Sequence, residues 1–586
     1  MPQPWLRRIW GEATALWSPL RRAGWIDFLI MIALAGLIFG LVDLAHEWTG
    51  EHRPTITIDL DDPWTLPRFT FYSLARGLLA YLISLTFTLC YGYWAAKDPL
   101  AERVLIPLLD ILQSIPVLGF MPGVVLALVG LFPHSNVGLE LAAILMIFTG
   151  QAWNMTFSFY HSVKSVPQDQ REVATVYRFS WWQRFKWVEL PFSMMGLVWN
   201  SMMSMAGGWF FLTAVEALTL GDQDFRLPGI GSYMRVAVDE ERADAMIWAI
   251  IAMVIMIVVL DQLLWRPVVA WAQKFRTEEG GQQEEVSSWF LNWLRRSNLL
   301  NYLGETLHRW TPKLHARVTS IESDNPSRAR SASWATPLSF MLFCVLLGGL
   351  GYGAWSILQL LKEVSWSQWA TLILAGLLTL GRVLLATALS TLIALPAGLA
   401  IGLSPRLSRT LQPVIQVVAS FPAPMLYYLL VPFLMWIGVW AGWGSVVLML
   451  LGTLWYILFN VVAGTMAIPT DLKESSQSYH IEGWQRFWTL YVPAVFPYLV
   501  TGWVTAAGGA WNTSILAEFV QFKKNGVDQV YQTIGLGAEI TKAAESKQFP
   551  LLAASILVMA CIVVTFNRTV WRRCYHLAER RFSLDK

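Results

Sequence analysis

Long apolar segments alternate with short charged loops along most of this chain. Runs of about eighteen or more apolar residues recur, and each is long enough to cross the hydrocarbon core of a bilayer as a helix. Only 14% of the 586 residues are charged, whereas soluble domains carry about 25%, and the mean hydropathy is +0.46. The sequence therefore predicts an all-α, polytopic membrane protein.

Twelve membrane spans are expected, six on each side of one polar region. Their approximate ranges are 25–45, 69–96, 104–132, 138–163, 192–220, 245–265, 336–361, 369–403, 411–437, 443–466, 494–520 and 549–571. The third span contains Pro107, Pro116 and Pro122. Because proline breaks the hydrogen-bond ladder of a helix, we expect this span to be kinked.

The distribution of charge predicts the orientation in the membrane. With loops on alternating sides, both termini and the polar region 266–335 fall on the side that gathers most Lys and Arg, whereas the loops 46–67 and 222–241 are rich in Asp and Glu. By the positive-inside bias, the N- and C-termini are cytoplasmic. The predicted organisation is a first half at 1–265 (core about 70–265), a linker at 266–335, and a second half at 336–586 (core about 376–570).

The linker contains one amphipathic pattern. Its apolar positions at helical spacing are Trp289, Trp293, Leu300, Leu303, Leu307 and Trp310, with Arg295, Arg296 and Arg309 among them. This pattern predicts a helix lying on the cytoplasmic membrane surface, with packing against protein as the open alternative. Residues 320–333 are typical of a flexible segment.

One charged stretch occurs twice. Residues 171–191 read REVATVYRFSWWQRFKWVELP, and residues 473–493 read KESSQSYHIEGWQRFWTLYVP. We call them the first and second islands. They share a basic residue followed by Glu, a Tyr, the sequence Trp-Gln-Arg-Phe and a final Pro. Each is a charged segment between long apolar ones, and the expected topology puts both on the cytoplasmic side.

The islands belong to a repeat of the whole half. Arg76 and Arg382 are 306 residues apart, and the pairs Ser114/Ser420, Asn154/Asn460 and Gly229/Gly535 share this offset, whereas the islands are 302 apart. Six spans per half make the repeat parallel. Four extra residues after Asn154 predict that the fourth helix of the first half is about one turn longer.

On these residues, both halves resemble the permease domain of ATP-binding-cassette importers of the nitrate, sulfonate, taurine and bicarbonate type. The matching stretches are Glu172-Val173-Ala174 to Leu190-Pro191 and Glu474-Ser475-Ser476 to Val492-Pro493, followed by Ala-Val-Glu216 or Leu-Ala-Glu518 and then a Gly-x-Gly. The family's Gly within the island is Arg178 in one half and His480 in the other, which puts the turn between the two short helices in question.

The resemblance implies a fused double permease of a bacterial inner membrane. Each island would be a coupling helix for one of two copies of a cytoplasmic ATPase, which would bind the ATP and Mg²⁺. A solute-binding protein would deliver a small, anionic solute from outside, and lipid would surround the chain. The implied coupling residues are Glu172, Ala174, Arg178, Trp182, Phe185, Pro191, Glu474, Ser476, His480, Trp484, Phe487 and Pro493.

Polar and aromatic residues within the spans are candidates for the solute pathway or its gate. They are Arg76, Ser114, Asn154, Trp209, Glu216, Arg382, Ser420, Asn460, Trp511, Asn512 and Glu518. An ionisable group at membrane depth usually faces a cavity or a partner, so Arg76 and Arg382 are possible partners of Glu216 and Glu518. Structural ion pairs and interhelical hydrogen bonds are the open alternative for the whole set.

Several functions lack the residues that they need. The chain contains no Gly-Lys dipeptide and therefore no phosphate-binding GxxxxGK[ST] loop, so we expect no ATP site, no enzymatic activity and no cofactor of its own. No metal-ligand spacing is present, and a net charge of +3 does not suggest nucleic acid. A secondary transporter and a non-transporting membrane scaffold or sensor are the alternatives to the permease.

Overall fold

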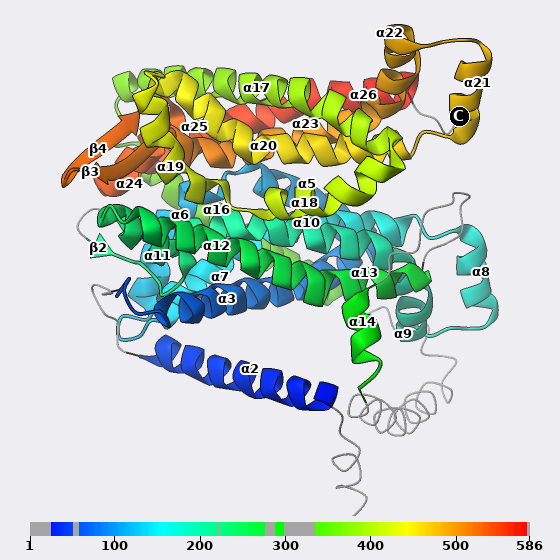
Figure 1. Cartoon of the computed structure of the whole chain (residues 1–586), viewed down its shortest axis with the longest axis horizontal. Coiled ribbons are helices and arrows are strands. Elements are labelled where there is room, and N and C mark those ends of the chain that lie inside the picture. The colour runs from blue at the N-terminus through cyan, green and yellow to red at the C-terminus, as the bar shows by residue number, and fades with distance from the viewer. Residues whose placement is uncertain (1–24, 51–57, 221–222, 276–287, 298–334, 583–586) are drawn as a thin grey trace, which may run out of the picture. The chain divides into compact units, whose positions relative to one another are not determined.

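The computed structural model describes residues 25–50, 58–220, 223–275, 288–297 and 335–582 (Figure 1). It forms two compact units: residues 1–47, 158–200 and 258–350 make one, and residues 48–157, 201–257 and 351–586 make the other. Helices dominate the described part of both, which confirms the all-α expectation.

The elements of the first sequence half follow one another with short connections. They are α2 (Trp25–Thr49), α3 (Thr65–Phe87), α4 (Tyr93–Lys97), α5 (Pro99–Ser114), α6 (Val117–Leu131), α7 (Val137–Lys164), α8 (Gln168–Val176), α9 (Trp181–Arg184), α10 (Leu190–Glu216), β1 (Thr219–Leu220), β2 (Gln223–Asp224), α11 (Ile230–Asp239), α12 (Ala243–Leu260), α13 (Arg266–Ala272) and α14 (Trp289–Leu294). Three π-helical segments, Thr88–Gly92, Phe185–Glu189 and Asp261–Trp265, lie within this series, and a 3₁₀ turn, Gln273–Phe275, follows α13.

The second half repeats this order. Its elements are α16 (Ala335–Leu361), α17 (Trp366–Leu403), α18 (Pro405–Ser420), α19 (Ala423–Trp436), α20 (Ala441–Met466), α21 (Thr470–Ser478), α22 (Gly483–Arg486), α23 (Val492–Ala517), β3 (Phe519–Lys524), β4 (Val527–Gln532), α24 (Leu536–Glu545), α25 (Phe549–Phe566) and α26 (Arg572–Arg581). The π-helical segments at Phe487–Tyr491 and Asn567–Trp571 stand where the first half has its own. The internal repeat is therefore a repeat of structure.

The described part of the chain has eight helices that are long and apolar enough to cross a membrane, or up to ten with two bent pairs. The bent pairs are the predicted third and ninth spans: residues 99–113 and 117–131 meet at 97°, and residues 406–420 and 423–436 meet at 83°. The kink expected in the third span is confirmed: the span breaks into two helices, with Pro116 at the start of the second. The two remaining predicted spans coincide with α10 and α16, which lie outside this count.

The four-residue irregularity in the repeat lies at the end of a helix. Helix α7 continues ten residues beyond Asn154, whereas α20 continues six residues beyond Asn460. The predicted extra turn is confirmed. The second half regains four residues in its hairpin, since β3 and β4 pair over six residues each and β1 and β2 over two. Neither hairpin was expected from the sequence.

Close helix packing in the second half uses small residues. Gly398 and Gly402, one turn apart on α17, face α20: a β-carbon on Gly398 would lie 2.6 Å from Val461, and one on Gly402 would lie 2.6 Å from Thr465. This small-xxx-small arrangement lets two helix backbones approach closely where no water is present to drive association. It holds α17 and α20 together beside α23, at whose end the cavity described below is found.

The predicted amphipathic helix of the linker lies mostly outside the described residues. Helix α14 covers its beginning, where the rings of Trp293 and Trp25 meet edge to face at 6.4 Å and Trp289 donates a hydrogen bond to Gln262. The arginines and tryptophans of the first 24 residues and of 298–334 are likewise outside the described part.

Candidate functional site

Glu216, at the end of α10, is held in a buried cluster. Its carboxylate accepts hydrogen bonds from the hydroxyl of Ser73 (2.7 Å) and from the backbone N–H of Gly231 (2.9 Å), and it pairs with the guanidinium of Arg76. Arg76 also forms a bidentate pair with Glu140, at 2.6 and 2.8 Å. All of these side chains are fully or almost fully buried. We call this set the first charged cluster.

The second half builds the same cluster around Glu518. The carboxylate accepts hydrogen bonds from the hydroxyl of Thr379 (2.9 Å) and from the backbone N–H of Gly537 (2.8 Å), and it pairs with Arg382 at 2.7 Å. We call this set the second charged cluster. The repeat places Val446 where the first half has Glu140. The second cluster thus pairs one acid with one base, whereas the first pairs two acids with one base.

The Gly-x-Gly after each hairpin is explained by these clusters. An added β-carbon on Gly229 would collide with the Glu216 carboxylate, and one on Gly535 would collide with that of Glu518. The second glycine of each motif lies against the backbone carbonyl of Thr213 or Ser514. Both carboxylate oxygens of each glutamate accept hydrogen bonds from protein donors. The first cluster joins α3 to α11, and the second joins α17 to α24. These contacts are those expected of structural ion pairs.

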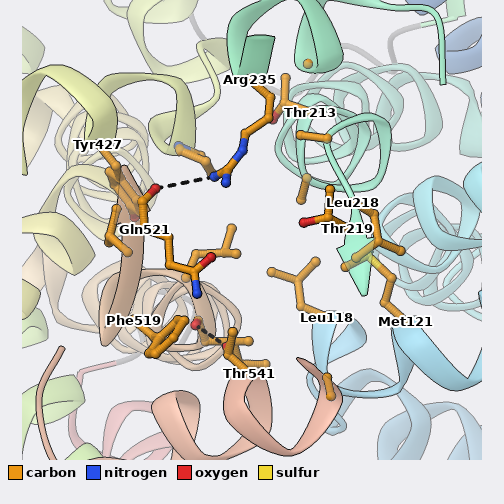
Figure 2. Close-up of a pocket in the computed structure, with 18 of the residues that line it drawn as sticks. Leu118, Met121, Thr213, Leu218, Thr219, Arg235, Tyr427, Phe519, Gln521 and Thr541 are labelled. Carbon is orange, nitrogen blue, oxygen red and sulfur yellow. Dashed lines mark hydrogen bonds between the residues drawn. The ribbon is translucent and has the colours of Figure 1, made fainter. Parts of the chain in front are cut away.

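A cavity of about 170 Å³ lies within the larger unit, between elements of both sequence halves (Figure 2). Leu118, Leu218 and Thr219 line one side, and Tyr427, Phe519 and Gln521 line another. Most of its wall is apolar. Of the described residues that line it, two carry formal charge: Arg235 on α11 and Glu545 on α24.

Gln521, on β3, contacts both charged residues. Its backbone carbonyl accepts a hydrogen bond from Nη1 of Arg235 at 3.3 Å, and its side-chain amide donates one to Oε2 of Glu545 at 3.2 Å. Asp239 contacts Nε of Arg235 at 3.3 Å and is not among the residues that line the cavity.

Burial affects the two charged groups differently. Burial raises the pKa of the Glu545 carboxyl, and Arg235 and the Gln521 amide act against this shift. Burial also disfavours the charged form of Arg235, but Tyr428, Asp239 and Glu545 outweigh it and raise the pKa of that guanidinium. Arg235 is therefore charged at every physiological pH.

The predicted pathway residues lie in several places. Trp209 and Trp511 are buried, and a β-carbon on Gly77 would contact the Trp209 ring. Asn512 accepts a hydrogen bond from the backbone N–H of Val117 at 2.8 Å and so joins α23 to α6. The polar groups of Ser420 and Asn460 bond to carbonyls of their own helices, Asn154 is exposed, and Ser114 ends α5. Of the residues that the structure describes around the cavity, none belongs to the predicted pathway set.

Arg235, Gln521 and Glu545 were missed by the sequence analysis. They stand in the segments between the apolar spans, whereas the predicted pathway residues lie within the spans. Their position in the sequence was the signal that could have pointed to them, because Arg235 and Glu545 follow the two Gly-x-Gly motifs. The repeat aligns Arg235 with Thr541 and Asp239 with Glu545.

Each island contains a short helix, α8 or α21, and the beginning of the long helix that continues into α10 or α23, with a left-handed residue between the two. Arg178 has φ of 51° and His480 has φ of 53°. The N–H of the left-handed residue and the N–H of the residue after it donate hydrogen bonds to carbonyls of the preceding helix. In the first island Arg178 bonds to Thr175 and Phe179 to Ala174, and in the second His480 bonds to Gln477 and Ile481 to Ser476. This is a Schellman cap, whose left-handed position favours glycine. The family's glycine position therefore keeps its backbone geometry in both halves.

The islands present aromatic rings to their surroundings. Trp182 and Phe185 stack at 5.6 Å in the first, and Trp484 and Phe487 stack at 5.1 Å in the second. Of the other predicted coupling residues, Ala174 and Ser476 are buried, Pro191 and Pro493 are half-buried, and Glu172 and Glu474 are exposed.

The two islands differ in detail. The first has a capping box between Ser180 and Gln183, whereas in the second Glu482 stands at the corresponding position without a side-chain cap. In the second island, burial and the neighbouring Arg486 lower the pKa of Lys473.

A family model described as "binding-protein-dependent transport system inner membrane component" matches residues 88–264 and again 390–582. The chain belongs to this family. It is a multi-pass permease of the ATP-binding-cassette type with two permease domains fused, and the internal duplication is one of domains.

The curated relatives are named as permease proteins of transport systems. The taurine transport system permease protein of Escherichia coli (strain K12) is 28% identical over 187 residues, which cover 31% of this chain and 62% of that protein. The bicarbonate transport system permease protein of Synechocystis sp. is 23% identical over 194 residues, covering 33% and 65%. The glycine betaine/proline betaine transport system permease protein ProW of Escherichia coli is 25% identical over 169 residues, covering 28% and 46%. The matches thus span about half to two thirds of each relative.

Proposed function

We propose that this chain forms the complete transmembrane pathway of an importer for a small solute. Two copies of a cytoplasmic ATPase would dock at the first and second islands, with ATP and Mg²⁺ bound by those subunits. A solute-binding protein would deliver the solute at the opposite membrane face, and the chain would sit in a bacterial inner membrane with both termini in the cytoplasm. The family and the duplication of its domain support this proposal.

The observation that carries the docking role is the conformation of the islands. Two stretches that differ in sequence adopt the same cap, with left-handed Arg178 and His480 at the position where the family has glycine. Left-handed backbone costs a residue with a β-carbon about 1–2 kcal/mol. Such caps end many helices, but here the same turn is kept in both halves although neither half has glycine at its left-handed position. A partner that recognises the shape of this turn would account for its retention.

Helix α23 offers a direct mechanical connection. It begins at the second island and ends at the cavity, where Ile515 and Leu516 are lining residues. Its 26 residues give it a length of about 39 Å, which exceeds the hydrocarbon core of about 30 Å. Movement of the docked end would therefore be transmitted to the cavity along one continuous helix.

Charge reversal at both islands tests the proposal. Glu172 and Glu474 are exposed on α8 and α21, so the double variant Glu172→Arg/Glu474→Arg is expected to fold and insert normally. We expect it to lose co-purification of the partner ATPase and to lose ATP-dependent uptake into proteoliposomes. The matched control is Glu240→Arg, an exposed acidic residue at the end of α11, outside both islands. Unchanged ATPase association and uptake in the island variant would refute the docking role.

A further inference from the structure

The charges of the cavity are opposite in sign and come from opposite halves of the repeat. Arg235 belongs to the first half and Glu545 to the second. At the corresponding positions, the repeat has Thr541 and Asp239. Thr541 donates hydrogen bonds to carbonyls of Ile515 and Gly537, and Asp239 contacts Arg235 and Arg226. The lining of the cavity is therefore asymmetric, with one cationic and one anionic group, and the cationic group also contacts Asp239 outside the lining.

Arg235 and Glu545 are held apart across Gln521. Each contacts a different part of that residue, the backbone carbonyl and the side-chain amide. A solute with both signs of charge on a short skeleton can approach both groups at once. Figure 2 shows the guanidinium of Arg235 directed toward the cavity beside Gln521, with apolar side chains such as Leu118 across from it.

Solutes with a single charge fit this site less well. An anion such as nitrate would be matched by Arg235, but Glu545 would then face it with like charge in a mostly apolar space. A cation would be matched by Glu545 and opposed by Arg235. Burying an uncompensated charge costs several kcal/mol, so the site discriminates against both classes.

The remaining lining gives the size and the shape of the ligand. A cavity of about 170 Å³ is smaller than the 300–1,000 Å³ typical of pockets for drug-sized ligands. Tyr427, Tyr428 and Phe519 are part of the wall, and aromatic rings attract ammonium groups, including quaternary ones.

We propose that this cavity is a binding site for a small zwitterion, in which Arg235 receives the carboxylate or sulfonate and Glu545 receives the ammonium. This inference rests on the proposed transport function and adds the class of solute. The sequence suggested a small anionic solute, whereas this site would also recognise a positive group on the same molecule.

The test uses probe molecules matched in shape. Taurine and ethanesulfonate differ by the ammonium group, glycine betaine and 3,3-dimethylbutanoate differ by the positive charge alone, and choline supplies a quaternary cation without an acid. Binding of each to the full chain in nanodiscs is measured by calorimetry. We expect at least one zwitterion to bind about tenfold more tightly than its anionic counterpart.

Two variants assign that preference to the cavity. Glu545→Gln is expected to weaken binding of the zwitterion by about tenfold and to abolish the preference over the anionic counterpart. Arg235→Gln is expected to weaken binding of both. The control Glu539→Gln changes a half-buried acid on the same helix that is not among the lining residues and should leave all affinities unchanged.

Three results would overturn the zwitterion site: no binding of either zwitterion, equal or tighter binding of the anions or of choline, or an unchanged preference in Glu545→Gln. The proposed function is tested separately by ATPase association at the islands. A chain that retains its ATPase and takes up a simple anion would refute the zwitterion site alone. Unchanged ATPase association and uptake in Glu172→Arg/Glu474→Arg would refute the proposed docking role, whatever the result for the zwitterion site.

Discussion

The carboxylate of Glu216 occupies the space that a β-carbon on Gly229 would need. Glu518 and Gly535 have the same relationship in the second half. Each glutamate lies against the start of the following short helix and accepts a hydrogen bond from the second glycine of the motif. The glycines are therefore required by close approach of a charged group, at backbone angles that other residues also adopt.

Gly229→Ala and Gly535→Ala are expected to destabilise the protein. The added methyl group must displace a buried carboxylate that is held by an arginine, so we expect a loss of about 1–3 kcal/mol and a lower midpoint of thermal unfolding in detergent. Gly508→Ala on α23 is the control, because an added β-carbon there meets nothing within 4 Å. A midpoint as high for Gly229→Ala as for Gly508→Ala would show that the Glu216 carboxylate can move aside at little cost.

The unequal charge of the two clusters gives a second prediction. Removing Glu140 by Glu140→Val leaves Arg76 with Glu216 and the carbonyl of Pro228, the pattern that the second half has around Arg382. We expect this variant to be mildly destabilised. Arg76→Ala leaves two buried carboxylates without a cation, and breaking such a group costs about 3–5 kcal/mol.

We expect Arg76→Ala to lower the midpoint of thermal unfolding more than Glu140→Val does. Arg382→Ala is the matched change in the second half. Arg382→Ala leaves one acid uncompensated and should fall between them. If Glu140→Val destabilises the protein as much as Arg76→Ala does, the two acids share the arginine more equally than the contacts indicate.

Restoring glycine in the islands should relieve backbone strain. Arg178→Gly and His480→Gly each remove a β-carbon from a left-handed position, which we expect to stabilise the cap by about 1 kcal/mol. The side chains of both residues are exposed, so little packing is lost. The measurement is amide exchange of Phe179 and Ile481, whose N–H groups close the two caps. Faster exchange in the glycine variants would show that the side chains themselves stabilise the turn.

The sequence predicted the features that depend on local pattern. Apolar length gave the positions of the helices, the prolines around Pro116 gave the break in the third span, and the repeat offset gave the extra turn of α7. The pairing of Arg76 with Glu216 followed from the cost of an isolated charge at membrane depth. The turn through Arg178 and His480 could be questioned from the sequence but not decided, because non-glycine residues can adopt the left-handed conformation at some cost.

The cavity depended on tertiary placement. Arg235, Gln521 and Glu545 are far apart in sequence and stand outside the apolar segments, so no spacing brings them together. Hairpin β3–β4 delivers Gln521 to a site whose charges come from α11 and α24. That hairpin is longer than its counterpart in the first half, which pairs over two residues, so the repeat does not predict the position of Gln521.

The tip of the β3–β4 hairpin is fastened to the first half by one carboxylate. Glu241 accepts hydrogen bonds from the backbone N–H groups of Asn525 (2.9 Å) and Gly526 (2.6 Å). The N–H of Gly526 and then that of Asn525 lower the pKa of this carboxyl from its usual value of 4.5, with a smaller opposing effect of desolvation. Because the folded pKa lies below the unfolded one, the contact stabilises the fold fully above pH 4.5 and is lost as the pH falls through the folded value.

We therefore expect acidification to release the hairpin tip. Protection of the Gly526 amide, measured by hydrogen exchange and corrected for the intrinsic rate, should fall in the wild type as the pH passes below 4.5 and through the lowered pKa of Glu241. In Glu241→Gln, protection should be lower at neutral pH and insensitive to this titration, since the neutral amide offers a weaker acceptor. Asp528, which also stands on the hairpin, supplies the control: Asp528→Asn should keep the wild-type profile. A wild-type profile without a transition in this range would show that the tip is held by other contacts.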